Sequence, residues 1–279
     1  MSLLRNAYTQ ADDVPARRRT RHARDHDHAP HTPFWVDLTS HDIEAATRFY
    51  GQLFDWAARQ DAGPEMRSYT VFTLTGKSVA GLFSPMVPGQ PSAWNVYIAS
   101  DNVDRVAESV QTAGGAVMME PDDIPGAGHM GFFRDPTGAA FGVMQPREHT
   151  GADVVREPNA FTWAELQTRD VAAVTPFYQQ VFGWGAKSSP IGPGQPEYTE
   201  WTLNGESVGG AMPMQAAIPA TVPPHWLAYF QVENADRSAA RVTELGGQIL
   251  TGPHDFPGGR FAVISDPHGA AFGILEART

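Results

Sequence analysis

Cysteine is absent from the 279 residues of this chain, which excludes disulfide bonds, thiolate metal sites and cysteine nucleophiles. Long apolar runs are missing as well. No stretch approaches the roughly 18 residues of a membrane-spanning helix, and the N-terminus lacks the residue order of a secretory signal peptide. The sequence therefore predicts a soluble, cytoplasmic protein that does not enter a membrane.

Basic residues are scarce. The chain has 20 Lys and Arg against 31 Asp and Glu, a formal net charge of −11. Because contact with nucleic acid phosphates needs clustered Lys and Arg, this balance argues against a nucleic-acid partner. Residues 1–30 differ from the rest, since they are rich in arginine and histidine and poor in large apolar side chains. We expect them to form a disordered basic, His-rich tail.

The chain contains the same sequence pattern twice. WVDLTSHDIEAATRFYGQLFDW at residues 35–56 returns as WAELQTRDVAAVTPFYQQVFGW at residues 163–184. GFFRDPTGAAFGVM at residues 131–144 returns as AVISDPHGAAFGIL at residues 262–275. A repeat of this length indicates two homologous domains, because the units of a solenoid are much shorter.

Each copy has the pattern of two modules, and each module consists of a strand, a helix and three further strands. In the first copy, residues 34–39 are typical of a strand, Asp42 can cap the helix that follows, and Asn102 can cap a second helix. The DPTG sequence at residues 135–138 has the chemistry of a tight turn between the last two strands. The predicted boundaries are domain 1 at residues 31–146, a polar linker at 147–158 and domain 2 at 159–279.

These motifs resemble the vicinal oxygen chelate superfamily, which includes glyoxalase I, bleomycin-resistance proteins and extradiol dioxygenases. The resemblance rests on the FY-x-x-x-F-x-W helix end, the strand-Asp-helix opening, the Gly-Gly after the second helix and the DP-x-G-A-x-F hairpin. It covers residues 33–279 and is nearest to a tandem, two-domain bacterial branch. It implies an α+β fold of two tandem glyoxalase-like domains, each with two βαβββ modules that form an open, cup-shaped sheet.

Members of this superfamily that do chemistry hold a divalent metal in the cup through His, Gln or Glu ligands. The resemblance carries four ligand positions onto each domain. They fall on Trp35, Thr73, Asn95 and Gly142 in the first domain and on Trp163, Thr202, Leu227 and Gly273 in the second. None of these residues is His or Glu, so we expect neither a metal site nor another cofactor.

The cups are instead expected to bind a small molecule. Strand alternation places Trp35 with Asp37, and Trp163 with Glu165, on one strand face. Aromatic walls, a few polar groups and an open floor at the glycines fit a small-molecule pocket; the alternative is that the aromatic residues fill a collapsed core. The candidate ligand-binding residues are Trp35, Thr73, Asn95, Tyr97, His129, Gly142, Met144, Trp163, Thr202, Tyr229 and Arg260.

Two functions follow from this interpretation. The first is a metal-independent binding protein, monomer or homodimer, that holds a planar aromatic or conjugated metabolite in a biosynthetic or resistance pathway, with a biosynthetic enzyme as a further partner. The second is a metal-free lyase, isomerase or hydrolase that uses Asp37 or Glu165 as an acid or base, since a carboxyl beside aromatic rings is expected to have a raised pKa. The ligand positions disfavour a metal-dependent glyoxalase or dioxygenase.

Overall fold

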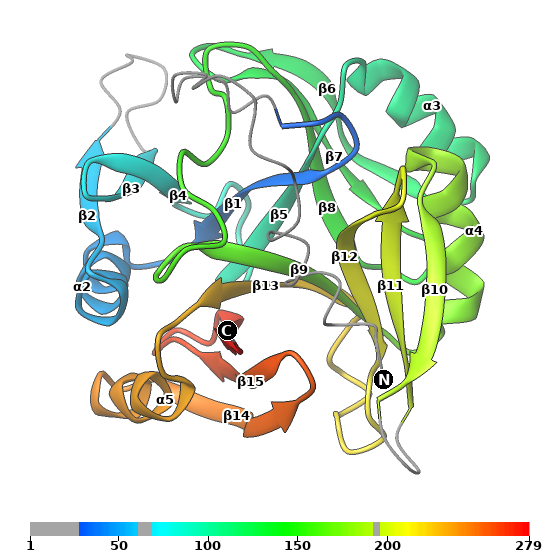
Figure 1. Cartoon of the computed structure of the whole chain (residues 1–279). Coiled ribbons are helices and arrows are strands. Elements are labelled where there is room, and N and C mark those ends of the chain that lie inside the picture. The colour runs from blue at the N-terminus through cyan, green and yellow to red at the C-terminus, as the bar shows by residue number, and fades with distance from the viewer. Residues whose placement is uncertain (1–27, 61–68, 192–195, 279) are drawn as a thin grey trace, which may run out of the picture.

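The computed structural model describes residues 28–60, 69–191 and 196–278, so the N-terminal tail expected at residues 1–30 lies almost entirely outside the described residues. Within the described ranges the chain forms four helices and sixteen strands (Figure 1). None of these helices combines the length and the apolar character needed to cross a membrane.

The first domain is one curled, eight-stranded sheet with two helices. Its elements are β1 (Pro33–Thr39), α2 (Ile43–Phe54), β2 (Ala57–Gln60), β3 (Thr70–Leu74), β4 (Lys77–Phe83), β5 (Ala93–Ala99), α3 (Val103–Thr112), β6 (Ala116–Ile124), β7 (Gly128–Arg134) and β8 (Ala140–Pro146). The strand order is β2-β3-β4-β1-β5-β8-β7-β6. The central strands β1 and β5 are antiparallel, and each is parallel to the last strand of its own module, β4 or β8. The two βαβββ modules therefore pair within the domain.

The second domain repeats this arrangement. Its elements are β9 (Phe161–Thr168), α4 (Val171–Phe182), β10 (Gly185–Pro190), β11 (Glu197–Leu203), β12 (Glu206–Pro213), β13 (His225–Gln231), α5 (Ala235–Glu244), β14 (Gln248–Phe256), β15 (Gly259–Ser265) and β16 (Ala271–Ala277). The order β10-β11-β12-β9-β13-β16-β15-β14 matches that of the first sheet strand for strand. The prediction of an α+β chain with two tandem, two-module domains is confirmed.

Local sequence explains where the helices begin and where the last hairpins turn. The Asp42 carboxylate accepts a hydrogen bond from the Ala45 amide at 2.8 Å, and Asn102 caps α3 in the same way. In the DPTG turn, one oxygen of Asp135 accepts the backbone amides of residues 137, 138 and 139. The predicted caps are therefore confirmed, and the second carboxylate oxygen of Asp135 is left for a longer-range contact.

The main hydrophobic core lies between the two domains. Residues of β1 and β5 such as Val36 and Val96 share one buried cluster with Phe230 and Phe272 of the second domain. Helix α2 lies beside α5, and α3 lies beside α4, so each helix of one domain packs beside a helix of the other (Figure 1). The alternate residues of the central strands point away from the shared core, into the concave face of each sheet. These concave faces are the two cups.

Candidate functional site

The N-terminal cup is built around a buried carboxyl group on β1. Asp37 is 2% exposed, and its register partner on β5 is Asn95. Trp35, two residues earlier, has Tyr97 as its register partner. The intervening residue Val36 belongs to the interdomain core. Strand alternation therefore brings these four side chains onto one face.

The Asp37 carboxyl group accepts three hydrogen bonds. Asn95 Nδ2 donates to Oδ1 at 2.9 Å, while the Tyr97 and Tyr69 hydroxyls donate to Oδ2 at 2.8 Å and 3.3 Å. The Tyr69 hydroxyl in turn accepts a hydrogen bond from Trp35 Nε1 at 2.9 Å. An indole, two phenols, an amide and a carboxyl thus form one continuous polar network in a mostly apolar cup.

The C-terminal cup has the same network around Glu165. The Tyr229 hydroxyl donates to its Oε1 at 3.1 Å, Tyr198 also hydrogen-bonds the carboxyl, and Trp163 Nε1 donates to the Tyr198 hydroxyl at 2.7 Å. The amide donor is Gln167 of β9.

The two networks place their amide donor on different strands. The position of Asn95 on β5 is occupied in the second domain by Leu227, which pairs with Glu165. The two copies therefore differ in sequence at this point, yet each carboxyl group receives one amide and two phenol donors.

Burial sets the acid–base properties of both carboxyl groups. Desolvation raises the pKa of Asp37 to about 7, against the lowering effect of the hydrogen bonds from Asn95, Tyr97 and Tyr69. Desolvation also raises the pKa of Glu165. Burial and the neighbouring carboxylate raise the pKa of the Tyr97 phenol. A carboxyl group that titrates near neutral pH can act as a proton donor or acceptor.

Glycines make room for the tyrosines. A Cβ atom on Gly142 would overlap the Tyr97 ring, and one on Gly273 would overlap the Tyr229 ring. In the same way, Gly81 lies directly against the Tyr69 hydroxyl. The expectation of an open floor at Gly142 and Gly273 is therefore wrong, because a tyrosine ring occupies the space that each glycine leaves.

Comparison with known proteins identifies the family. The sequence profile of the Glyoxalase/Bleomycin resistance protein/Dioxygenase superfamily matches residues 32–143 and 160–274. The chain belongs to this superfamily. The match covers both copies of the repeat and confirms the resemblance that the motifs indicate.

Two similar proteins match this chain over most of their own length. A Mycobacterium tuberculosis (strain CDC 1551 / Oshkosh) protein named "Putative glyoxylase CFP32" is 43% identical over 251 residues, which are 88% of this chain and 94% of the relative. The Streptomyces peucetius anthracycline biosynthesis protein DnrV is 36% identical over 266 residues, with coverage of 90% and 94%.

Solved structures show the same fold at lower identity. The Mn(II)-bound glyoxalase from Novosphingobium aromaticivorans aligns with a TM-score of 0.62 at 20% identity and covers 89% of this chain and 83% of its own. The 2,3-dioxygenase LapB from Pseudomonas sp. KL28 aligns with a TM-score of 0.60 at 14% identity, with coverage of 88% and 92%. At these identities the comparison establishes the fold alone.

The superfamily fold can hold a catalytic metal, but the donors of this chain do not fit one. The carried-over positions hold indole, hydroxyl, amide and aliphatic side chains and glycines. Among the described residues, no three His, Asp or Glu side chains come together in a way that could hold a metal ion. The N-terminal cup has one buried carboxyl group, Asp37, and the C-terminal cup has two, Glu165 and Glu200. These groups already accept hydrogen bonds and are a poor substitute for a set of nitrogen and oxygen ligands.

The structure also corrects one of the carried-over positions. The strand beside β1 is β4, so the residue that pairs with Asp37 there is Gly81. Thr73 lies on β3, one strand further out, and its hydroxyl donates to the Ala57 carbonyl at 3.3 Å. Thr202 has the equivalent place on β11, opposite Gly185. Neither threonine is therefore the strand neighbour of Asp37 or Glu165.

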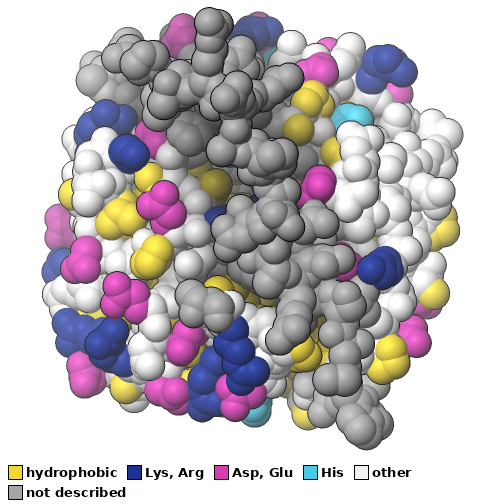
Figure 2. Space-filling view, viewed as in Figure 1, with side chains coloured by type: hydrophobic (Ala, Val, Ile, Leu, Met, Phe, Trp, Pro, Cys, Tyr) yellow, Lys and Arg dark blue, Asp and Glu magenta, His cyan; other side chains and the backbone are white. Residues whose placement is uncertain are grey.

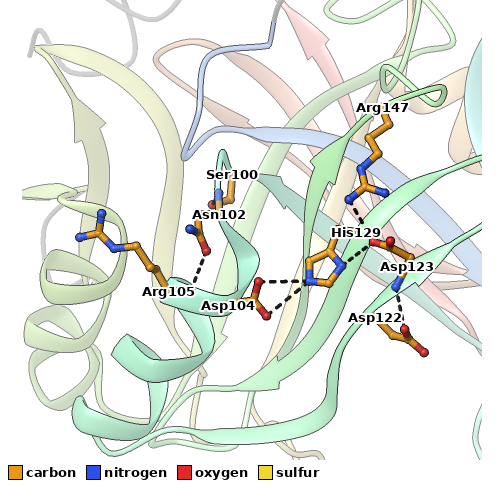
Figure 3. Close-up of polar contacts among 8 residues, drawn as sticks. All are labelled: Ser100, Asn102, Asp104, Arg105, Asp122, Asp123, His129 and Arg147. Carbon is orange, nitrogen blue, oxygen red and sulfur yellow. Dashed lines mark hydrogen bonds and ion pairs between the residues drawn. The ribbon is translucent and has the colours of Figure 1, made fainter.

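His129 lies away from the candidate residues of the N-terminal cup. Its strand neighbour Met130 faces the N-terminal cup, while His129 points to the other side of β7. Its Nδ1 lies 2.7 Å from the Asp123 carboxylate, and its Nε2 lies 3.4 Å from the carboxylate of Asp104 at the start of α3 (Figure 3). Because the two ring nitrogens face different carboxylates, this group connects α3 to the sheet.

Arg260 has the same role in the second domain. Its guanidinium forms two hydrogen bonds with Asp236 in the first turn of α5, at 2.8 Å and 2.9 Å. A further ion pair of 3.3 Å joins it to Asp255 of β14. Met144, by contrast, is buried in the apolar cluster of the N-terminal cup.

A groove outside the cups is a weaker candidate site. It has a volume of about 430 Å³, lies between α2 and α5 and is lined by Asp55, Glu233 and Arg241 among others. Acidic and basic side chains intermingle on this side of the molecule (Figure 2), and Arg241 forms an ion pair of 3.0 Å with Glu244. The groove therefore has no excess of positive or negative charge that would attract a charged ligand.

Tyr69, Tyr198 and Gln167 belong to the two networks but are not among the residues predicted from the sequence. A signal was available for the tyrosines, because both begin a YT-x-aromatic-T-Leu segment at equivalent points of the two copies. Each tyrosine also lies two residues before a side chain that faces the cup, Val71 or Glu200. The contribution of Gln167 is visible only in the folded chain, since its copy-one counterpart is Thr39.

Proposed function

We propose that this chain is a metal-independent binding protein for a planar aromatic or conjugated small molecule, which it holds in a cup. The observation that carries the proposal is the network around Asp37 and Glu165, which joins an indole, two phenols and a carboxyl group in each cup. Aromatic rings offer flat apolar surfaces to a planar molecule, and the polar network orients it through hydrogen bonds.

The relatives support a role in the chemistry of small metabolites. One relative of similar length is named for anthracycline biosynthesis. A binding protein in such a pathway would sequester a reactive product or remove it from a partner biosynthetic enzyme. Binding without turnover also accounts for the absence of a suitable metal-donor set among the described residues.

The second candidate is a metal-free lyase, isomerase or hydrolase. It is favoured by one observation, the pKa of Asp37, which burial raises to about 7. A carboxyl group with this pKa exists in both protonation states at neutral pH and could transfer a proton to or from a bound substrate.

One experiment separates the two functions. Purified protein is titrated with a panel of planar aromatic compounds, binding is followed by quenching of tryptophan fluorescence, and the compounds are recovered and analysed by chromatography. We expect quenching to saturate at a fixed stoichiometry and the compounds to be recovered unchanged. Multiple turnovers that disappear in Asp37→Asn or Glu165→Gln would establish the catalytic alternative instead.

A further inference from the structure

The two cups differ in what covers them. The segment after β8 crosses the N-terminal cup, where Ala152 is buried and its amide donates to the Phe34 carbonyl at 3.1 Å. The backbone of Asp153 is tied to Ser78, with its amide 2.7 Å from the Ser78 carbonyl. The His149 ring packs edge-on against the Trp35 indole, with 4.3 Å between the ring centroids and an angle of 79°.

The result is a closed cup. Trp35 is only 1% exposed, although it lies on the concave face of the sheet. The imidazole of the linker contacts this indole directly. The linker thus already takes up space beside Trp35, where the sequence predicts a ligand.

The C-terminal cup is more open. Trp163, the counterpart of Trp35, is half-buried, and Glu165 is 8% exposed where Asp37 is 2% exposed. Among the described residues no aromatic ring or imidazole packs against Trp163 as His149 packs against Trp35. The face of the second indole is therefore the more accessible of the two.

The C-terminal cup is also more polar. Glu200 of β11 pairs with Gly210 of β12, which in turn pairs with Glu165 of β9, so the two carboxyl groups share one face of the sheet. Glu200 is buried and accepts a hydrogen bond from Ser207. Its counterpart in the first domain is Val71. Over residues 28–60, 69–191 and 196–278, neither carboxyl has an ion-pair partner.

We infer that the C-terminal cup is the ligand site and that it takes a flat aromatic ring bearing a hydrogen-bond donor, while His149 of the linker closes the N-terminal cup. Trp163 stacks on the ring, and Glu200 and Glu165 accept the donor, which is a phenolic hydroxyl or an ammonium group. Glu200 selects for the donor, because a carboxylate can only accept hydrogen bonds and its burial makes an unsatisfied site costly. This inference rests on the proposed binding function.

The location of the site is tested by NMR on the full chain labelled with ¹⁵N-tryptophan. The seven indole signals are assigned with single Trp→Phe variants, and 2-naphthol, 2-naphthylmethylamine and naphthalene are the probes. We expect the Trp163 signal to shift as one equivalent of probe binds, and Trp163→Leu to weaken binding about tenfold. A shift of the Trp35 signal in place of Trp163, or two equivalents bound to the wild-type chain, would overturn the inference but leave the binding function intact.

The role of Glu200 is tested with Glu200→Val, which installs the residue of the first domain. The variant should bind 2-naphthol and 2-naphthylmethylamine about tenfold more weakly and leave the affinity for naphthalene within about twofold. Glu206→Gln, at an exposed position of the adjacent strand, is the matched control for loss of one negative charge. The ratio of the affinities for 2-naphthol and 2-naphthylmethylamine shows whether the site prefers a hydroxyl or an ammonium group. Equal loss for all three probes would contradict donor selection.

Closure of the N-terminal cup is tested with His149→Ala. Removal of the imidazole should expose the Trp35 indole and add a second equivalent of bound naphthalene probe. A stoichiometry that stays at one in this variant would show that His149 does not close the cup. If no probe binds to any of these proteins, even at saturating concentration, the proposed binding function itself is contradicted together with this inference.

Discussion

The Tyr50 hydroxyl of the first domain donates a hydrogen bond to Asp266 of the second domain at 3.2 Å. The reciprocal bond, from Tyr178 to Asp135, measures 3.0 Å. Each tyrosine also accepts an indole N–H, from Trp94 or Trp226. The turn of each domain is thus joined to the first helix of the other, within the core that the two copies share.

Removal of either hydroxyl should weaken the whole molecule. Tyr50→Phe and Tyr178→Phe each leave a buried indole N–H and a carboxyl oxygen without this partner, so we expect a loss of about 1–3 kcal/mol in the free energy of unfolding. Urea denaturation followed by circular dichroism measures the loss. A loss in only one of the two variants would contradict the equivalence of the two contacts.

Titration of Asp37 should make stability depend on pH. Burial raises its pKa from 3.8 to about 7, so the folded chain holds a proton that the unfolded chain releases between these values. The free energy of unfolding should therefore fall as pH rises from about 4 to 7, by up to about 4 kcal/mol from this group. Burial also raises the pKa of Glu165, so its titration should likewise lower the free energy of unfolding as pH rises.

The Asp37→Asn variant isolates this effect, because asparagine does not titrate. Its free energy of unfolding should change less steeply with pH than that of the wild type. Asp101→Asn, which changes an exposed carboxyl group, should keep the wild-type slope. Identical slopes for all three proteins would mean that Asp37 is already ionised throughout this range.

The two cup tryptophans should differ in their contribution to stability. Trp35 is fully buried beneath the linker, whereas Trp163 is half-buried. Trp35→Ala should cost about 3–5 kcal/mol, and Trp163→Ala no more than about 2 kcal/mol. Thermal or urea unfolding of the two variants gives the comparison. Equal costs would indicate that the two indoles are equally embedded in their cups.

The protein should carry no stoichiometric divalent metal in its cups. The expectation rests on the lack of His or Glu at the ligand positions carried over from the superfamily and at Gly81 and Gly210 beside β1 and β9. Elemental analysis is best made on a chain that begins at Ala29, because the N-terminal histidines could bind metal by themselves. One tightly held zinc, iron, nickel or manganese ion per domain would refute the metal-independent function.

Short-range patterns in the sequence were sufficient for much of the architecture. The duplication fixed the number of domains, and the caps at Asp42 and Asn102 fixed the helix starts. Strand alternation alone placed Trp35 with Asp37 on one face, because successive side chains of a strand point to opposite sides. The caps and the strand faces depend on residues a few positions apart, and the duplication is visible in the sequence itself, so none of these features required knowledge of long-range contacts.

The make-up of the cups was decided by tertiary structure. Which strand lies beside β1 depends on the strand order within the module. The folded chain places β4 there, so the neighbour of Asp37 is Gly81 and not Thr73. The side of β7 on which His129 lies depends on register, since a shift of one residue exchanges the two faces. The course of the linker over Trp35 depends on packing between segments far apart in the chain. The sequence by itself determined the two domains and their cup-facing rows, and only the folded chain decided which cup is closed.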